Sequence, residues 1–155
     1  MRIQWKKLVI CIAIPLAVGG LSALLTRDSM EDFELLNKPP LSPPGWLFPV
    51  VWTILFTLMG IASYLVLQSH KTHHVRTALT VYGVQLVFNF LWSMIFFNLA
   101  LYWPAFIWLV LLWLLILANI FLFYRISKPA GYLLVPYILW VTFAGYLNVG
   151  IALRN

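Results

Sequence analysis

The stretch NKPPLSPPGWLFPVVWTILFTLMG, residues 37–60, changes from a proline-rich loop into a long apolar segment. Four prolines precede Trp46. Because proline fixes the backbone φ angle, they stiffen the chain toward an extended geometry. The largely apolar run that follows reaches residue 67, close to the length of about 20 residues that a helix needs to cross a bilayer. We therefore expect the chain to enter a membrane here, beneath a stiff loop.

The composition of the whole chain is that of a membrane protein. Of its 155 residues, 63% are hydrophobic and 9% are charged, whereas a soluble domain carries about 25% charged residues. The net charge of +6 requires no nucleic-acid partner, because Lys and Arg collect in the cytoplasmic loops of membrane proteins. Cys11 is the only cysteine, so we expect neither a disulfide framework nor a thiolate metal cluster.

Five apolar segments have the length of membrane helices: about 8–25, 46–67, 77–97, 104–124 and 131–152. Lipid offers no partner to free backbone groups, so each segment must be helical. The sequence predicts an all-α membrane protein, a five-transmembrane-helix bundle forming one domain over residues 1–155, with a long loop at 26–45. A signal peptide is the alternative for the first segment, but its apolar run is too long and no A-x-A site follows it.

The basic residues predict the orientation in the cell membrane. Seven of them belong to one side of the bundle: Arg2, Lys6, Lys7, Lys71, Arg76, Arg125 and Lys128. The other side has Arg27, Lys38 and Arg154, and its 26–45 loop contains all four acidic residues. The positive-inside rule then predicts a cytoplasmic N-terminus and a C-terminus outside.

The 26–45 loop allows two interpretations, a lid over the bundle or a proline-rich spacer. Residues 26–36 are polar enough to form a short helical turn with Asp28 or Ser29 as its cap.

Polar and aromatic residues in the segments recur at helical spacing, three and four residues apart. In segment 77–97 one face carries Tyr82, Gln85, Asn89, Trp92 and Phe96. In segment 131–152 one face carries Pro136, Trp140, Ala144, Leu147 and Asn148. Segment 46–67 has a shorter stripe of Pro49, Trp52, Phe56 and Gly60, and segment 8–25 has a small-residue face of Pro15, Gly19 and Ala23. Segment 104–124 is mostly Leu, Ile, Trp and Phe, and we expect it to meet the most lipid.

These faces fit either helix packing or a ligand pocket. Trp52 lies about 9 Å below Trp46 at the helical rise of 1.5 Å per residue. Asn89, Trp92 and Asn148 reach a similar depth under the loop. Amides and aromatic rings often join membrane helices. They also suit a flat, apolar ligand, because indoles stack on conjugated rings and amides meet polar edges.

Other signals are weaker. His70, His73 and His74 could bind a metal, but a solvated loop is the favoured interpretation, and we predict no metal site. No charged residue lies within a segment, which disfavours proton relays and paired carboxylates. Cholesterol-type patterns occur at residues 122–128 and, reversed, at residues 76–84, but such patterns are common by chance.

Three blocks of the sequence resemble the translocator protein family: KPPLSPPGWLFPVVWTILFTLMGIASYLV, GVQLVFNFLWSMIFF and LLVPYILWVTFAGYLNVGI. This TspO/MBR family is also called the tryptophan-rich sensory protein or peripheral-type benzodiazepine receptor family. The resemblance, to a bacterial-type member, runs from Pro15 to Asn148. It implies a five-helix bundle, usually a homodimer, with a pocket opening toward the first long loop. It also implies ligands such as porphyrins, cholesterol and benzodiazepine-type compounds.

The resemblance also implies roles for particular residues. The pocket tryptophans correspond to Trp52 and Trp140, the small ligand-facing residue to Ala144, and the polar pair to Gln85 and Asn89. Phe33 stands where many members have Tyr. The complete predicted ligand site is Phe33, Pro43, Pro44, Trp52, Gln85, Asn89, Trp92, Trp140, Ala144, Leu147 and Asn148. The C-terminal cholesterol motif is broken, because Tyr146 is followed by seven residues before Arg154.

Three functional classes follow from the resemblance. The first is a binding and sensing protein for protoporphyrin IX, haem-type or other flat hydrophobic ligands, with no tightly bound cofactor. The second is an enzyme that degrades protoporphyrin IX with light and oxygen, using Trp52 and Trp140 as oxidisable indoles. The third is a porphyrin or sterol transporter. The sequence has no acid, base or nucleophile constellation for dark catalysis, and we rank the binder first.

Overall fold

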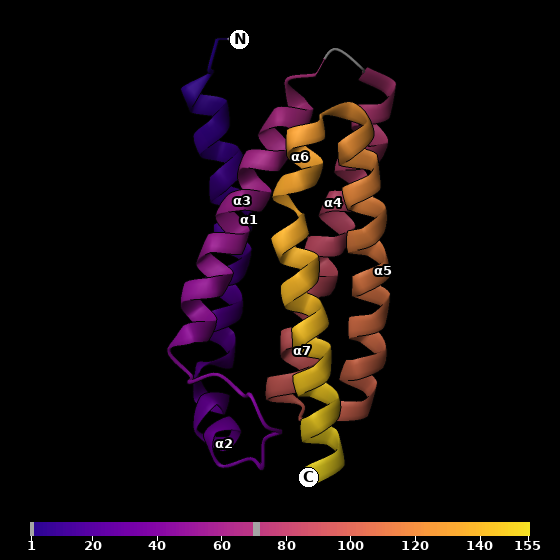
Figure 1. The fold of residues 1–155 in the computed structure, drawn as a ribbon. Helices are drawn as coiled ribbons and strands as arrows, with labels where there is room; N and C mark the ends of the chain where they lie inside the picture. Colours follow the sequence, from indigo (N-terminus) through magenta and orange to yellow (C-terminus); the bar gives the residue numbers. More distant parts are fainter. Residues whose placement is uncertain (1, 70–71) are drawn as a thin grey trace.

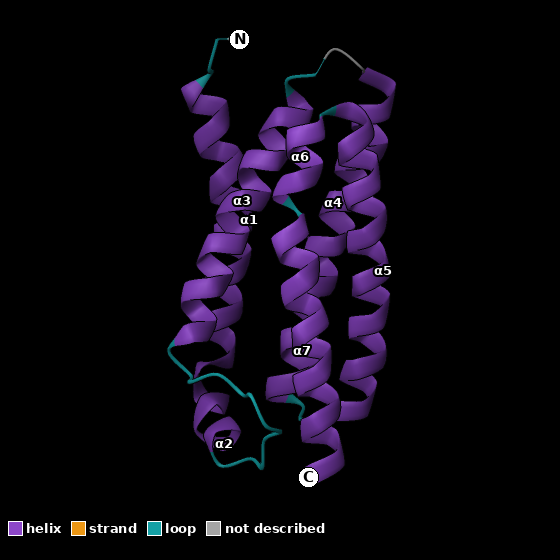
Figure 2. Ribbon diagram, viewed as in Figure 1, coloured by secondary structure: helices purple, strands orange, loops and turns teal. Residues whose placement is uncertain are grey.

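The computed structural model describes residues 2–69 and 72–155, and its secondary structure in these ranges is helical throughout (Figure 2). The elements in chain order are α1 (Trp5–Thr26), the 3₁₀ turn η1 (Arg27–Ser29), α2 (Met30–Glu34), α3 (Leu47–Leu67), α4 (Thr72–Ser93), the π-helical turn η2 (Met94–Asn98), α5 (Tyr102–Ile126), α6 (Lys128–Leu133) and α7 (Val135–Arg154). His70 and Lys71 lie outside the described residues.

The prediction of an all-α bundle with five membrane-length helices is confirmed. Five helical stretches are long and apolar enough to cross a bilayer: Trp5–Glu34, Leu47–Leu67, His74–Asn98, Tyr102–Ile126 and Lys128–Arg154. They run alternately up and down, so the two termini lie at opposite ends of the bundle (Figure 1). The C-terminus shares its end with α2 and the long loop, and we call this the loop end.

The last span is interrupted where the sequence suggested one continuous helix. α6 ends at Leu133, and α7 begins two residues later at Val135. Pro136 stands in the first turn of α7. It has no N–H to donate and its ring clashes with the preceding turn, so a helix can begin at Pro136 but cannot easily run through it. At the break, the Leu134 amide donates to the Gly131 carbonyl instead.

α1 and α3 approach each other closely because glycine stands at the contact. A Cβ placed on Gly60 would lie 2.5 Å from Cα of Ile12 and 2.7 Å from the carbonyl oxygen of Cys11. Pro15, one turn further along α1, has no N–H for the Cys11 carbonyl. Gly19 likewise has no room for a side chain, because a Cβ there would meet the Phe56 ring. The expected small-residue face of this segment therefore packs against α3, as such faces do in membranes.

Segment 104–124, which we expected to meet the most lipid, is not the least buried of the five spans. Only 11% of the most apolar window in the first span is buried, against 28% for the α5 span. α5 packs against both α4 and α7, whereas α1 packs mainly against α3 at one edge of the bundle (Figure 1). Composition did not reveal this, because Leu and Ile are equally at ease facing lipid or facing another helix.

The close contact of α1 with α3 gives a test of the fold. We expect Gly60→Ala to destabilise the protein by about 1–3 kcal/mol, because the added methyl group meets the α1 backbone. Gly20→Ala is the matched control, because nothing lies within 4 Å of a Cβ there. Denaturation in mild detergent, followed by circular dichroism, measures both. Equal stability of the two variants would show that α1 does not sit this close to α3.

Candidate functional site

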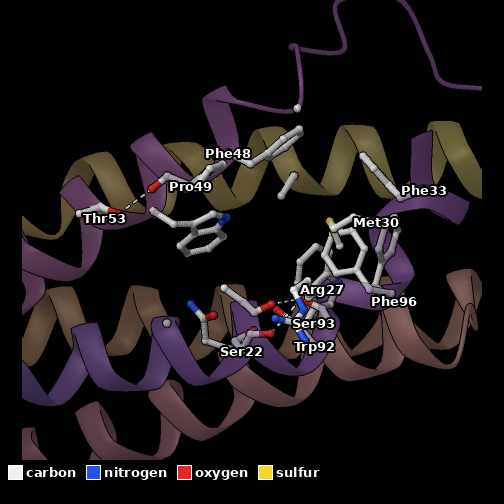
Figure 3. A pocket seen from close by; sticks show the side chains of 18 of the residues that line it. Ser22, Arg27, Met30, Phe33, Phe48, Pro49, Thr53, Trp92, Ser93 and Phe96 are labelled. Carbon is white, nitrogen blue, oxygen red and sulfur yellow. Dashed lines mark hydrogen bonds between the residues drawn. The ribbon is translucent and has the colours of Figure 1, made fainter.

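A cavity of about 560 Å³ lies at the loop end of the bundle (Figure 3). Its walls come from α1, α3, α4, η2 and α7, and α2 contributes at the loop side. Ligand sites in proteins commonly have volumes of about 300–1,000 Å³ and mainly apolar walls. The helix packing therefore leaves room for a small organic molecule.

Eight of the eleven residues predicted from the sequence line this cavity: Phe33, Trp52, Asn89, Trp92, Trp140, Ala144, Leu147 and Asn148. They come from α2, α3, α4 and α7, segments far apart in the sequence. The faces that share helical spacing in α4 and α7 thus meet around one space. The other three predicted residues, Pro43, Pro44 and Gln85, do not line the cavity.

Gln85 lies one helical turn below the cavity floor in a chain of buried hydrogen bonds. The hydroxyl group of Tyr137 donates to Oε1 of Gln85 at 2.6 Å. The same hydroxyl oxygen accepts a hydrogen bond from Nδ2 of Asn89 at 2.8 Å. Gln85 and Tyr137 are fully buried, and Asn89 is the member of the chain that lines the cavity. Gln85 therefore acts on the cavity only through Tyr137 and Asn89.

Sequence reasoning missed Tyr137 as part of the site. The signal was present, because Tyr137 precedes Trp140 by three residues and Ala144 by seven, the spacing of one helix face. Its hydroxyl group fixes the Asn89 amide and links α4 to α7. Such bonds between membrane helices are individually modest, about 0.6 kcal/mol on average. Their main effect here is to fix the direction of the amide at the cavity floor.

A second set of hydrogen bonds holds the wall formed by Trp92 and Asn148. Nε1 of Trp92 donates to Oδ1 of Asn148 at 3.1 Å, and Nδ2 of Asn148 donates to the carbonyl of Tyr102 at 2.8 Å. The polar atoms of both side chains are therefore engaged within the protein. Both residues offer mainly their flat surfaces to the cavity.

Aromatic rings form most of the remaining wall. Trp52 stacks on Phe56 with ring centroids 5.4 Å apart and meets Tyr137 edge-on at 6.3 Å. Trp140 meets Phe48 edge-on at 5.9 Å. At the loop side, Phe33 contacts the rings of Phe48, Phe96 and Phe97. Phe48 and Phe97 were absent from the predicted site, and they contact it because α3 and η2 bring them beside Phe33.

The short helix expected within residues 26–36 forms as α2, and its residues Met30, Phe33 and Glu34 line the loop end of the cavity. Ser29 precedes α2, but neither predicted capping bond forms there. The Ser29 hydroxyl instead donates to Oδ1 of Asn98 in η2 at 2.6 Å, and Nδ2 of Asn98 donates to the carbonyl of Leu25. The π-helical turn η2 therefore holds the end of α1 and the start of α2 beside the cavity.

Two charged residues stand at the rim of the cavity, and the sequence analysis assigned neither to the site. Arg27 and Glu34 are both lining residues. The Arg27 side chain is 74% exposed, and its Nε lies 4.0 Å from Oδ1 of Asp28. An exposed pair of this kind contributes little, so the guanidinium group remains available to an anionic group at the rim.

Among the residues that the structure describes, no three His, Cys, Asp or Glu side chains come close enough to hold a metal ion. Of the three histidines considered in the sequence, His70 and the side chain of His73 lie outside what the structure describes.

The sequence is similar to a known family of membrane proteins. The TspO/MBR family model matches residues 11–154. The tryptophan-rich protein TspO of Chlorobaculum tepidum is 41% identical, covering all of this chain and 99% of its own length. The tryptophan-rich sensory protein of Cereibacter sphaeroides is 36% identical over 96% of this chain and 90% of its own length. The translocator protein of Bos taurus is 31% identical over 96% and 89% respectively. The chain therefore belongs to the TspO/MBR family of multi-pass membrane proteins.

Proposed function

We propose that this protein binds a tetrapyrrole such as protoporphyrin IX in the cavity at the loop end and serves a sensing role. The observation that carries the proposal is the cavity wall itself, in which Trp52, Trp92 and Trp140 stand around one space. Indole rings stack favourably on a flat conjugated ligand. The name of the Cereibacter sphaeroides relative, a tryptophan-rich sensory protein, supports the sensing part.

The polar groups of the cavity also suit a tetrapyrrole. Asn89 lines the cavity at its floor, and because its Nδ2 is bonded to Tyr137, its amide oxygen is the atom offered to a ring N–H group. Arg27 at the rim is placed for a carboxylate, because guanidinium and carboxylate groups form paired hydrogen bonds. An apolar ring system with an acidic side group at one edge would match an aromatic interior with Arg27 at its rim.

Orientation and assembly form part of the same proposal. Six of the seven basic residues assigned to the cytoplasmic side lie within the described residues, at the end opposite the loop: Arg2, Lys6, Lys7, Arg76, Arg125 and Lys128. The positive-inside rule supports a loop end facing outward. A homodimer is expected from the resemblance to the family.

The first test is a titration with protoporphyrin IX in detergent, in the dark. We expect saturable binding to the wild type and an affinity lower by at least a few-fold for Ala144→Leu, because the larger side chain projects into the cavity. Overpacking of this kind typically costs about 1–3 kcal/mol. Ala13→Leu is the control, since Ala13 is exposed on α1 away from the cavity. Equal affinities for the two variants would show that the ligand does not contact α7 at Ala144.

The second test concerns Arg27 at the rim. Arg27→Gln should weaken binding of protoporphyrin IX, by about tenfold if the charge-assisted bond is worth roughly 1.5 kcal/mol. It should leave binding of the dimethyl ester unchanged, since the ester has no carboxylate to pair. Arg125→Gln, at the other end of the bundle, serves as the control. An equal loss for the acid and the ester would show that Arg27 acts by packing.

A second candidate function is the light-driven degradation of the bound porphyrin. The observation that favours it is that Trp52 and Trp140, both oxidisable indoles, line the cavity in which the photosensitiser would sit. Indole–ring contact places an electron-rich side chain against the excited ligand. Oxygen from solution would be the second reactant.

Illumination separates this candidate from simple binding. In the double variant Trp52→Phe/Trp140→Phe an apolar ring remains at each position, so dark affinity should fall only modestly. Bleaching of bound protoporphyrin at equal occupancy should fall at least tenfold, because phenylalanine is far harder to oxidise than indole. Absorbance spectra under calibrated light measure the rate. Bleaching at the wild-type rate would show that the two tryptophans line the cavity but take no part in the photochemistry.

A further inference from the structure

The cavity reaches the side of the bundle as well as its loop end. Pro49 and Thr53 of α3 both line the cavity, yet both are exposed on the surface of the bundle. Figure 3 shows them with Phe48 along one edge of the cavity. They follow Trp46 by three and seven residues, so at 1.5 Å per residue they lie about 5 Å and 10 Å further along the membrane helix. This edge of the cavity therefore faces lipid.

The opening at this edge exists because α3 and α7 do not pack on each other. α3 packs against α1, α4 and α6, whereas α7 packs mainly against α5. Within the part of the chain that the structure describes, no contact of comparable extent joins α3 to α7. On the side of Leu134 away from the loop end, α6 packs against α3. Between Leu134 and the loop end, α3 and α7 lie side by side without close packing, and we call this boundary the seam.

Two aromatic pairs bridge this seam, Trp52 with Tyr137 and, nearer the loop end, Phe48 with Trp140. The Phe48 ring of α3 meets the Trp140 ring of α7 edge-on, with centroids 5.9 Å apart and an interplanar angle of 67°. Both rings are only half-buried and line the cavity. Side chains can change rotamer without moving either helix. The Thr53 hydroxyl donates to the Pro49 carbonyl at 2.7 Å, so no unsatisfied hydroxyl obstructs an apolar path here.

At the loop end, the segment 37–40 is fastened to α7 and the C-terminus. The Asn37 amide donates to Oδ1 of Asn155 at 3.2 Å, and Nδ2 of Asn155 donates back to the Asn37 carbonyl at 2.9 Å. The Tyr146 hydroxyl donates to the Pro40 carbonyl at 2.6 Å. Pro39 packs so tightly on Gly150 that a Cβ on the glycine would collide with its ring. The loop is thus fastened along α7.

We propose that a flat apolar ligand enters this cavity sideways from the bilayer, between α3 and α7, and that Phe48 and Trp140 form the gate. The ligand class rests on the proposed function, but the route rests on the seam, its two rings and the fastened loop. A ligand dissolved in the membrane would reach the site without crossing the loop. The bilayer then acts as the reservoir from which the protein samples its ligand.

Stopped-flow kinetics on the full chain in lipid vesicles test the route, with protoporphyrin IX preloaded in the bilayer as the probe. Thr53→Trp places a bulky ring in the seam and should slow both association and dissociation at least fivefold. If Thr53 only packed against the bound ligand, Thr53→Trp would weaken that packing and raise the dissociation rate instead of lowering it. Ile54→Trp is the control, because Ile54 is exposed to lipid on the same helix and does not line the cavity.

Two further variants complete the test. Phe48→Ala removes one ring of the gate and should raise both rates at least threefold, which also covers the case in which Thr53→Trp does not fold. Asn155→Ala/Tyr146→Phe loosens the loop and should leave the association rate within twofold of wild type. Faster association on loosening the loop, or unchanged rates in both gate variants, would overturn the route. Absence of binding to the wild type would instead overturn the proposed function.

Discussion

The architecture of the site depends on the two hydrogen bonds made by the Tyr137 hydroxyl group. This hydroxyl donates to Gln85, accepts from Asn89 and so joins α4 to α7 at the floor of the cavity. In lipid, apolar side chains gain little by facing protein rather than acyl chains. Polar bonds and close glycine contacts therefore decide which helices meet. Here they join α4 to α7 through Tyr137, Trp92 and Asn148, and α1 to α3 through Gly60.

The cavity is the space left between these two units. α1 and α3 form one pair, and α4, α5 and α7 form a second group (Figure 1). They are joined by the contacts of α1 and α3 with α4, by α6 at one end of the bundle, and by η1, α2 and η2 at the other. A site built in this way has aromatic side walls, an amide floor and a rim where charged residues can stand. The same division leaves the seam between α3 and α7 that faces lipid.

Much of this could be read from the residues alone. The bilayer permits only helices in a chain of this composition, so hydropathy and length predicted five spans. Helical spacing placed Asn89 with Trp92, and Trp140 with Ala144 and Asn148, each set on one face. The motifs around Trp52 and Trp140 identified the family. These inferences succeed because they depend on local helical periodicity and on the bilayer, which permits few structures other than helices.

The tertiary structure decided which of those faces meet and what stands between them. Gln85 and Asn89 share a helix face, one turn apart. Asn89 lines the cavity, whereas Gln85 is covered by Tyr137 and only supports the cavity floor. Arg27, Glu34 and Phe97 join the site through the path of η1, α2 and η2, which no periodicity specifies. The span that contains α1, rather than α5, is the least buried, because Leu and Ile do not encode which side of a helix finds a partner. Sequence thus determined the helices and their polar faces, whereas neighbours and exposure followed from packing, in which small differences among many weak contacts select one arrangement.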